Sequence, residues 1–549
     1  MGLVTRRQPG LHSYDLVSYP GKPHVGAHCR NLEAIAALFK AAPVAPSAAR
    51  VLELGCGTGA NFLPQAFEYP DAHFVGCDLA ATALASAAQV VEALGLRNVE
   101  LRHASISDVG ADWGQFDYIL CHGVFSWVGP PLRRKIMEIL RANLAPQGVA
   151  YVSYNCYPGW HLRGSVRELL CRHVAGIDDP RQAIAQARQI LALAAEVDNH
   201  DGPYRNLIRD EYLLLSHADE SYLYHEMLEE HNQPFYFEEF VAQAESAGLQ
   251  YLADADYSAM YSWDLPPTAR DFLAGVPFPA REAQLDWLRG CAFRSSLLCH
   301  REVQLDRQVD PMVLNTFAIA LADDATFEKQ ASAKLTPETK PDGDENVWLL
   351  RTNRCEIRSA DPLIVAAARK LEDRRPEFVS LQELRDQTPR NVGQRSGGAM
   401  VGASSEFRNT DRDDPFARFF LDALEAGVLE ASLSPPNVAS RIGDRPTVSR
   451  LAAFQASYGN WVTNQRHRVV PLSDLGRLLA QLLDGTRDCR TVQEIITQEL
   501  ESGRVKLCPF DEVAESVIVT VRGILEMFRR EALLVTIPEH FATELDYPE

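Results

Sequence analysis

Short apolar segments alternate with longer segments of helical periodicity between residues 51 and 155. Segments of the first kind are typical of buried strands, and segments of the second kind are typical of amphipathic helices. Their alternation predicts a parallel α/β sheet with helices on its faces. The predicted strands are VLELG (51–55), HFVGCD (73–78), VELRHAS (99–105), FDYILCHG (116–123) and GVAYVSYN (148–155), and the predicted helices include 79–95 and 131–145.

Further along the chain the pattern changes, and amphipathic helices dominate up to about residue 230. Residues 165–176 and 180–197 have helical periodicity. Residues 237–257 then predict a helix, a stop at Gly248 and a strand, and residues 294–305 predict another strand. A block of helices therefore separates the alternating segment from these last elements.

A glycine-rich segment follows the first predicted strand. Gly55, Gly57 and Gly59 occupy alternate positions, and Glu53 stands two positions before the first of them. Glycines between a strand and a helix let the backbone approach a ligand closely, because no Cβ stands in the way. A carboxylate at this point repels a diphosphate and attracts an ammonium or sulfonium group. The segment therefore predicts a ligand that is cationic at one end.

Two further acids follow the next two strands. Asp78 ends the second strand, where a carboxylate can accept hydrogen bonds from both hydroxyls of a ribose. Asp108 follows the third strand, where it can accept from an adenine amino group while Ile106 packs on the ring. Either acid alone is also explained as a helix cap, but the combination fits S-adenosylmethionine. The predicted cofactor-binding residues are Glu53, Gly55, Cys56, Gly57, Gly59, Asn61, Asp78, Leu79, Ser107, Asp108, His122, Gly123 and Val124.

This part of the chain resembles the cofactor half of class I S-adenosylmethionine-dependent methyltransferases, and ELGCGTG (53–59) matches their first motif. Residues 10–260 also resemble methyltransferases with a methyltransferase regulatory domain, a group that includes bacterial protein-lysine methyltransferases acting on outer-membrane proteins. The sequence departs from that pattern at AHC around His28, where a Thr-His-Pro-like triplet is expected. The segments that carry the second resemblance are SYDLVSYPGKPHVGAHCRNLEAIAALF, HGVFSWV, SYNCYPGWHLR and SYLYHEMLEEHNQPFYFEEF.

The resemblance implies an α/β fold: a Rossmann-like seven-stranded class I methyltransferase sheet with an inserted helical domain and two accessory C-terminal domains. A chain of 549 residues is also too long for a single core. Gly, Ser and charged residues dominate 389–415, which predicts a flexible linker. The predicted regions are 1–164 (first part of the cofactor-binding domain), 165–235 (inserted helical regulatory or dimerisation region), 236–306 (closing helix and strands), 307–388 (middle accessory domain), 389–415 (linker) and 416–549 (C-terminal accessory domain).

The composition of the chain restricts the classes of binding partner and the cellular compartment that we expect. With 54 basic and 74 acidic residues the chain carries a net charge of −20, which disfavours nucleic acid and anionic membranes as partners. The 11 cysteines form no CxxC motif, which favours reduced thiols in the cytoplasm over a disulfide frame or a zinc site. In HEMLEEH, His225 and His231 are spaced too widely for the HExxH motif, so we expect no metal.

Methyl transfer requires chiefly that the acceptor atom be aligned with the sulfonium methyl group. Candidates for the acceptor site lie after the fourth and fifth strands and in the N-terminal segment, which we expect to fold over the cofactor as a lid. Aromatic rings at these positions suit a lysine ammonium through cation–π contacts, or they pack in the core. The predicted acceptor-site residues are Tyr14, Tyr19, His122, Tyr154, Asn155 and Trp160.

The part of the chain beyond residue 310 is larger than a small-molecule acceptor would require, which indicates a macromolecular acceptor. The resemblance implies that this acceptor is a lysine in a protein. The amphipathic helices of 165–235 predict a homodimer, because long apolar stripes must be buried. Two alternatives stay open. One is methylation of a small molecule or a peptide natural product, and the other is a non-catalytic module that senses the cofactor and regulates a partner.

Overall fold

The computed structural model describes residues 16–17, 19–197, 202–329, 347–386, 414–504 and 517–536. Tyr14 and residues 389–413 of the predicted linker lie outside this set. The chain forms two compact units, which are described separately below. Unit 1 comprises Met1–Lys22, Ile35–Asp256 and Gly275–Leu305, and unit 2 comprises Pro23–Ala34, Tyr257–Ala274 and Asp306–Glu549.

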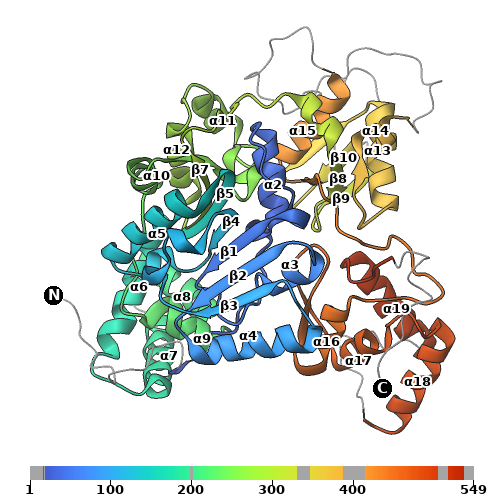
Figure 1. The fold of residues 1–549 in the computed structure, drawn as a ribbon, viewed down its shortest axis with the longest axis horizontal. Helices are drawn as coiled ribbons and strands as arrows, with labels where there is room; N and C mark the ends of the chain where they lie inside the picture. The colour runs from blue at the N-terminus through green and yellow to red at the C-terminus, as the bar shows by residue number, and fades with distance from the viewer. Residues whose placement is uncertain are drawn as a thin grey trace. The chain divides into compact units, whose positions relative to one another are not determined.

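Unit 1 is built on a seven-stranded sheet with the order β3-β2-β1-β4-β5-β7-β6 (Figure 1). The first five strands of the chain pair in parallel, whereas β7 is antiparallel to β5 and β6. The Rossmann-like α/β sheet predicted from the sequence is therefore confirmed. The strands are β1 (Arg50–Leu54), β2 (His73–Asp78), β3 (Val99–His103), β4 (Phe116–Cys121), β5 (Leu144–Asn155), β6 (Leu249–Asp254) and β7 (Phe293–His300).

The parallel strands bring their carboxyl ends to one edge of the sheet. Glu53 in β1 lies opposite Gly76 in β2 and Leu120 in β4, so the segments that follow these strands start side by side. The strand order reverses between β1 and β4, and open α/β sheets bind ligands in the crevice at such a point. The fold therefore places the glycine-rich segment where a ligand is expected.

Helices cover the sheet on both faces, which explains why β1 and β4 are apolar on both sides. In Figure 1, α5 and α10 lie together on one side of the sheet and α3 lies on the other. The helices of this part of unit 1 are η2 (Pro46–Ala48), α3 (Leu63–Glu68), α4 (Ala81–Leu94), η3 (Ile106–Asp108), η4 (Ala111–Trp113), η5 (Phe125–Trp127), α5 (Pro130–Asn143), α10 (Phe237–Ser246) and α12 (Ala280–Arg289).

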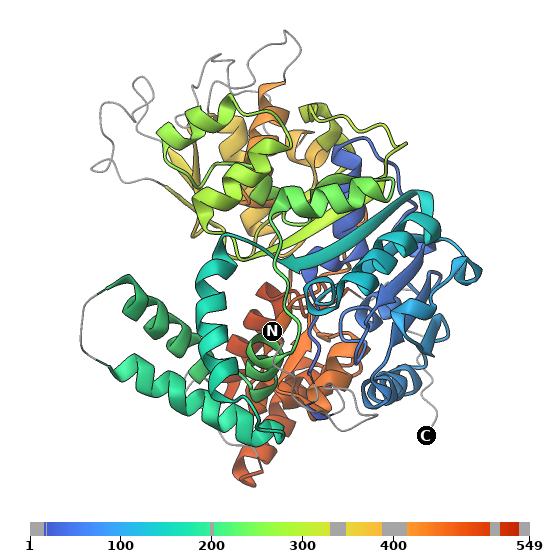
Figure 2. The same cartoon turned by 90° about the vertical axis from the view of Figure 1, so that its left-hand side faces the viewer.

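A separate helical block lies between β5 and α10 in the chain and is drawn in teal and green in Figure 2. Its helices pack around fully buried side chains such as Ala187 and Leu215. The first of them begins at Gly159, earlier than predicted. This position requires glycine, because a Cβ there would lie only 2.6 Å from Ala292 Cβ. The block comprises α6 (Gly159–His173), α7 (Pro180–Glu196), α8 (Pro203–Ser216), α9 (Glu220–Leu223) and the π-helical turn η6 (Tyr224–Leu228).

Unit 2 combines small antiparallel sheets with helices. Its sheets have the orders β11-β10-β9, β12-β8-β13 and β14-β15. Helix α2 (Cys29–Leu38) begins in unit 2 and ends in unit 1. The strands are β8 (Ala318–Leu321), β9 (Thr326–Lys329), β10 (Trp348–Arg351), β11 (Glu356–Ser359), β12 (Val379–Ser380), β13 (Leu429–Ser432), β14 (Trp461–Thr463) and β15 (Val469–Pro471). The helices are η1 (Val25–Ala27), η7 (Tyr257–Met260), α11 (Pro267–Ala274), η8 (Pro311–Thr316), α13 (Pro362–Asp373), α14 (Leu381–Asp386), α15 (Pro415–Glu425), α16 (Arg450–Tyr458), α17 (Asp474–Leu482), α18 (Cys489–Glu501) and α19 (Val517–Arg530).

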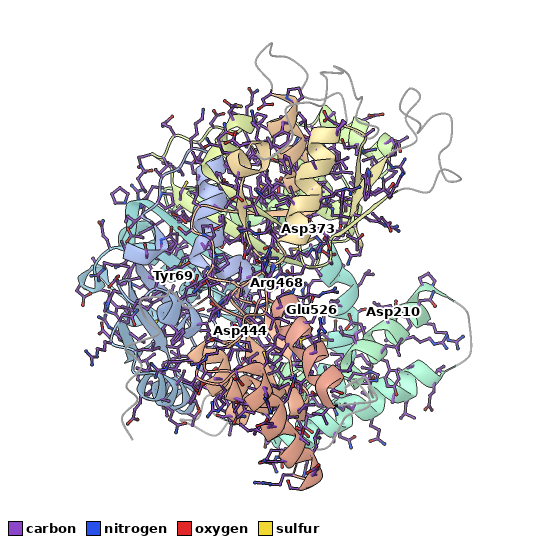
Figure 3. All side chains as sticks on the ribbon, turned by 90° about the vertical axis from the view of Figure 1, so that its right-hand side faces the viewer. Tyr69, Asp210, Asp373, Asp444, Arg468 and Glu526 are labelled. Carbon is purple, nitrogen blue, oxygen red and sulfur yellow. The ribbon has the colours of Figure 1, made fainter. Side chains whose placement is uncertain are left out.

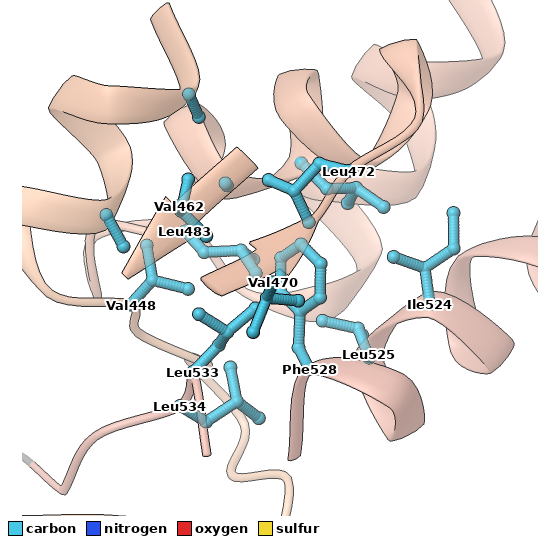
Figure 4. Close-up of a cluster of buried hydrophobic side chains, with 14 of the residues drawn as sticks. Val448, Val462, Val470, Leu472, Leu483, Ile524, Leu525, Phe528, Leu533 and Leu534 are labelled. Atoms are coloured by element: carbon cyan, nitrogen blue, oxygen red, sulfur yellow. The ribbon is translucent and has the colours of Figure 1, made fainter. Parts of the chain in front are cut away.

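The last part of unit 2 has an apolar core of its own (Figure 4). Phe528 of α19 is fully buried in it, together with Val462 of β14 and Leu475 of α17. Four helices and a two-stranded sheet therefore enclose one cluster of apolar side chains, which is the packing expected of a small independent domain.

Basic side chains of the segment 466–468 form ion pairs inside unit 2. Arg466 Nη1 is 2.6 Å from Asp323 Oδ1. Arg468, labelled in Figure 3, contacts Glu430 Oε1 at 2.5 Å and Asp323 Oδ2 at 2.7 Å. This cluster is therefore neutralised within the unit. Separately, no helix of the described residues combines the length and the apolar character that crossing a membrane requires.

Candidate active site

The glycine-rich loop after β1 adopts backbone conformations that favour glycine. The φ angles of Gly55, Gly57 and Gly59 are +73°, +53° and +75°. A Cβ on Gly55 would come within 2.7 Å of Val124 Cγ2, whereas a Cβ on Gly57 would have no atom within 4 Å. The loop is therefore packed against the segment after β4 at one point and open at another, as a backbone surface for a ligand requires.

The side chain of Glu53 is buried beside this loop. Its Oε1 accepts a hydrogen bond from Asn61 Nδ2 at 2.8 Å, and its Oε2 is buried without a hydrogen-bond partner among the described residues. Burial raises the pKa of Glu53 to about 8, against the opposite effect of the hydrogen bond from Asn61. A buried carboxylate of this kind is stabilised by a cationic partner, and the ammonium group of S-adenosylmethionine fits that requirement.

Asp78 fixes the loop as well as facing the predicted ribose position. Its Oδ2 accepts a hydrogen bond from the Gly57 amide at 2.8 Å, and its Oδ1 accepts one from the Ala80 amide at 2.8 Å. Each carboxylate oxygen has a second lone pair for a further donor. The loop conformation and the ribose contact predicted for Asp78 therefore depend on one side chain, a coupling that the sequence did not indicate.

The side chains of Cys56 and Leu79, which are near Glu53 and Asp78 in the chain, lie in different environments. The Sγ of Cys56 points toward β2, because a Cβ on Gly76 would lie 2.9 Å from it, so Cys56 offers its backbone to the loop. Leu79 has 46% of its side chain exposed beside Asp78. An exposed leucine at the end of β2 suits an apolar contact with a bound nucleoside.

The segment after β3 forms a capping box. Asp108 Oδ2 accepts a hydrogen bond from the Ser105 amide at 3.0 Å, and Ser105 Oγ accepts one from the Ser107 amide at 3.1 Å. Ile106 is buried, whereas Ser107 and Asp108 are exposed. Asp108 is therefore the acidic member of a capping box whose N-cap is Ser105, and the adenine contact predicted for its exposed carboxylate stays a prediction.

The segment after β4 is tied to β5 and β7 by polar side chains. His122 Nδ1 and the Tyr151 hydroxyl are 2.9 Å apart, and that hydroxyl is 2.9 Å from Ser295 Oγ. The Gly123 amide donates to Ser153 Oγ at 2.8 Å. These contacts hold the loop from His122 to Val124 against the carboxyl end of the sheet. Tyr151 and Ser153 were missed in the sequence, although they share one face of β5 by alternation.

Phe293 is a further residue that the sequence did not identify. It lies opposite Asn155 at the start of β7, and its ring centroid is 6.0 Å from that of His122. Its side chain is 48% exposed, which is unusual for a phenylalanine in a sheet. Asn155 itself is buried, with its amide Nδ2 donating to Asn232 Oδ1 at 3.0 Å. The half-buried His122 and the exposed Phe293 therefore place two aromatic rings side by side at the carboxyl end of β4 and the start of β7.

Two predicted acceptor-site residues pack in the core instead. Tyr154 is 1% exposed, its ring stacks on Phe240 at 4.0 Å, and its hydroxyl is 3.1 Å from Ser296 Oγ. Trp160 is also buried and meets the Trp127 ring edge-on at 6.4 Å. Tyr154 therefore packs between the sheet and α10, and Trp160 packs on the ring of Trp127, so we withdraw both from the predicted acceptor site.

The N-terminal lid is only partly supported. Tyr19 belongs to unit 1 and meets the His225 ring edge-on at 5.6 Å. His28, by contrast, is buried in unit 2 with its ring 4.7 Å from that of His467. His28, where the sequence departs from the family triplet, is therefore a core residue of unit 2 in this structure. Tyr14 lies outside the described residues and stays a prediction.

Comparison with known proteins agrees with this geometry. Residues 51–148 match a methyltransferase domain, residues 219–300 match a family described as a predicted methyltransferase regulatory domain, and residues 444–533 match the PKMT C-terminal winged helix domain. The uncharacterized protein RP789 of Rickettsia prowazekii is 30% identical over 538 residues, covering 95% of this chain and 93% of that protein. The uncharacterized protein RP028 of the same organism is 34% identical over 44% of this chain and 96% of its own length.

Among solved structures, PKMT2 from Rickettsia typhi is similar along nearly the whole chain. It is 27% identical, with a TM-score of 0.78, over 94% of this chain and 100% of that one. The same protein in complex with AdoHcy gives a TM-score of 0.77. This chain belongs to the family of class I S-adenosylmethionine-dependent methyltransferases with a methyltransferase regulatory domain. Its cofactor is S-adenosylmethionine, and the buried Glu53 and the open glycine loop fit that molecule.

Proposed function

We propose that this methyltransferase modifies the side-chain amine of a lysine in a protein. The observation that carries this proposal is the similarity to PKMT2, a protein lysine methyltransferase, over 94% of this chain and 100% of that one. The similarity includes the C-terminal winged helix region at 444–533 and is not confined to the methyltransferase domain. A match confined to the methyltransferase domain would have supported methyl transfer but would not have indicated a protein as the acceptor.

In the proposed reaction the cofactor supplies an electrophilic methyl carbon bonded to a sulfonium sulfur. The lysine nitrogen forms a bond to that carbon, the carbon–sulfur bond breaks, and S-adenosylhomocysteine leaves. Before the attack the lysine ammonium loses a proton to solvent, because only the neutral amine has a free lone pair. The chain has mainly to align the two reactants, which well-placed groups achieve without a covalent intermediate.

We assign the cofactor contacts to the segments after β1 to β4. Glu53 faces the ammonium end, Asp78 the ribose and Asp108 the adenine, while the glycine loop provides the surface beneath them. His122, Asn155 and Tyr19 remain the proposed acceptor-side residues from the sequence, and Phe293 joins them because of its exposed ring beside His122. Aromatic faces at such positions stabilise an approaching cation.

The experiment that tests the acceptor class uses methyl-labelled S-adenosylmethionine with the purified chain and a cell-envelope extract. After acid hydrolysis of the labelled protein bands, we expect label in methylated lysine. Label confined to the small-molecule fraction would support a small-molecule or peptide natural product as acceptor. Cofactor binding without label in any fraction would support a sensing module and would contradict the proposal.

We also propose a cytoplasmic homodimer that forms through the helical block and has no membrane or nucleic-acid partner. Apolar side chains on α7 and α8 support this arrangement, since they are 49–62% exposed in the single chain and would be buried by a second copy. Sedimentation equilibrium should give twice the chain mass of 61.0 kDa, and a mass of one chain would contradict it. The exposed residues are Leu193, Tyr204, Leu213 and Leu214.

A further inference from the structure

Two cysteines that are far apart in the chain meet inside unit 1. Cys156 Sγ donates a hydrogen bond to Cys291 Sγ over 3.4 Å, although 135 positions separate the two residues in the sequence. Cys156 directly follows β5, and Cys291 stands two residues before β7. An S–S bond is about 2.05 Å long, so the two sulfur atoms would have to come about 1.4 Å closer than 3.4 Å to form a disulfide.

Main-chain hydrogen bonds hold the two segments together around this pair. The Cys156 amide donates to the Ala292 carbonyl oxygen at 3.0 Å, and the Gly159 amide donates to the Cys291 carbonyl oxygen at 2.8 Å. A Cβ on Gly159 would lie only 2.7 Å from that same oxygen. The two backbones therefore run as close together as neighbouring strands of a sheet, which is a spacing that a disulfide can bridge.

The two thiols differ in their exposure and in their acidity. Cys156 is fully buried, whereas Cys291 is half-buried. The hydrogen bond from Cys156 lowers the pKa of the Cys291 thiol, against the opposite effects of burial and of Asp286. The same hydrogen bond and burial raise the pKa of the Cys156 thiol. Because the thiolate is the attacking form, Cys291 is suited to react first with a reagent from solution, and Cys156 is suited to react second.

We propose that Cys156 and Cys291 form a reversible disulfide, so that the junction between β5 and β7 is a site of redox modification. The oxidant is a low-molecular-weight disulfide such as glutathione disulfide. The Cys291 thiolate, having released its proton to solvent, forms a bond to one sulfur atom of this molecule, whose own S–S bond breaks, and a glutathione thiolate leaves.

In the second step the Cys156 thiol gives its proton to the departed glutathione thiolate and attacks Cys291 Sγ. The second glutathione leaves as a thiolate and takes up the proton that Cys291 released. Two protein thiols are thereby oxidised to a disulfide, and one glutathione disulfide is reduced to two thiols. An excess of reduced glutathione reverses both steps.

The disulfide would close a loop from residue 156 to residue 291. This loop contains the whole helical block from α6 to η6, together with α10, β6 and α12. A cross-link over such a long loop stabilises the folded chain, chiefly by restricting the unfolded one. We therefore expect the oxidised chain to melt about 5 °C above the reduced chain.

The test maps disulfides in the full chain. The folded chain is incubated with glutathione disulfide, unfolded in iodoacetamide and digested with trypsin without a reductant. Cys156 and Cys291 are the single cysteines of the tryptic peptides 142–163 and 290–294. We expect these two peptides to be joined, with two hydrogen atoms fewer than the separate peptides, and to separate in dithiothreitol. Recovery of both peptides in alkylated form would overturn the inference, and so would glutathione retained on Cys291 beside an alkylated Cys156.

Variants connect the bond to the change in stability. Cys291→Ser should lose both the joined peptides and the rise in melting temperature. The control is Cys171→Ser in α6, since Cys171 is a half-buried cysteine whose Sγ is 3.1 Å from the Met227 carbonyl oxygen, and it should keep both. An equal rise in Cys291→Ser and in the original chain would contradict the inference. If Cys291→Ser fails to fold, Cys156→Ala provides the same comparison, and the peptide mapping needs no variant. No acceptor is present, so a negative lysine-labelling result would refute the proposed function without affecting this test.

Discussion

At the scale of single residues, Asp78 connects the shape of the glycine loop to cofactor binding. It accepts hydrogen bonds from the Gly57 and Ala80 amides and is also the predicted partner of the ribose hydroxyls. We expect Asp78→Ala to weaken S-adenosylhomocysteine binding by about 100-fold, because charge-assisted hydrogen bonds and loop support are lost together. Calorimetry measures the effect, with the exposed Asp71→Ala as control. Unchanged affinity in a folded Asp78→Ala variant would refute the assignment.

Gly55 provides a second test at this scale, because a Cβ added to it would meet a neighbouring side chain, whereas a Cβ added to Gly95 would not. Gly55→Ala would combine the unfavourable backbone conformation with a contact 2.7 Å from Val124 Cγ2. Gly95, at the end of α4, has a φ of +65° and no atom within 4 Å of an added Cβ. Each alanine should cost about 1–2 kcal/mol in backbone strain, but only Gly55→Ala should also abolish the thermal stabilisation by S-adenosylhomocysteine. Equal ligand responses of the two variants would contradict the loop's role.

At the scale of elements, one buried arginine joins β6, β7 and α12. Arg294 contacts Asp254 at 3.3 Å, Glu282 at 2.7 Å and Asp286 at 3.1 Å. We expect Arg294→Met to destabilise unit 1 by about 3–5 kcal/mol, because it leaves buried carboxylates without their partner. Chemical denaturation measures the loss. The exposed Arg172→Met, which removes a surface ion pair to Glu168, is the matched control and should change stability by less than about 1 kcal/mol.

The same cluster predicts a pH dependence. Burial raises the pKa of Asp254 from 3.8 to about 7, since burial outweighs the attraction of Arg294. The folded chain therefore keeps a proton that the unfolded chain releases, and this contribution to stability is complete below about pH 4 and lost by about pH 7. Denaturation from pH 5 to pH 8 should show a smaller decline in stability for Asp254→Asn than for the original chain. An identical decline in both would contradict the assignment.

The elements themselves were largely predictable, for a definite reason. The predicted strands at 51–55, 73–78 and 116–123 agree with β1, β2 and β4 to within two residues, because buried parallel strands are short apolar runs bounded by glycine or polar residues. The directions in which individual side chains point were harder to predict. Since β5 is buried on both faces, its pattern does not indicate that Tyr151 faces the site and Tyr154 the core. Contacts between distant segments, such as Val17 with His225, leave no local signal.

At the scale of the whole molecule, the prediction concerns the segment between the accessory regions. Deleting residues 391–412 should leave the melting temperature within about 2 °C, because a linker of Gly, Ser and charged residues contributes little burial. Differential scanning calorimetry measures it. A fall of many degrees in the melting temperature would contradict the prediction of a flexible linker. That segment lies outside the described residues except for Asp414 and Pro415. The last core, around Phe528, should unfold as before in the same scan.

Every function argued above depends on one proposed site, in which S-adenosylmethionine binds at the carboxyl ends of the strands of unit 1. Equilibrium dialysis of the full chain against S-adenosylmethionine and S-adenosylhomocysteine tests this most directly. The account predicts saturable binding of both, at one site per chain and in competition with each other. Absence of binding by a folded chain, or binding that neither Asp78→Ala nor Gly55→Ala weakens, would contradict it.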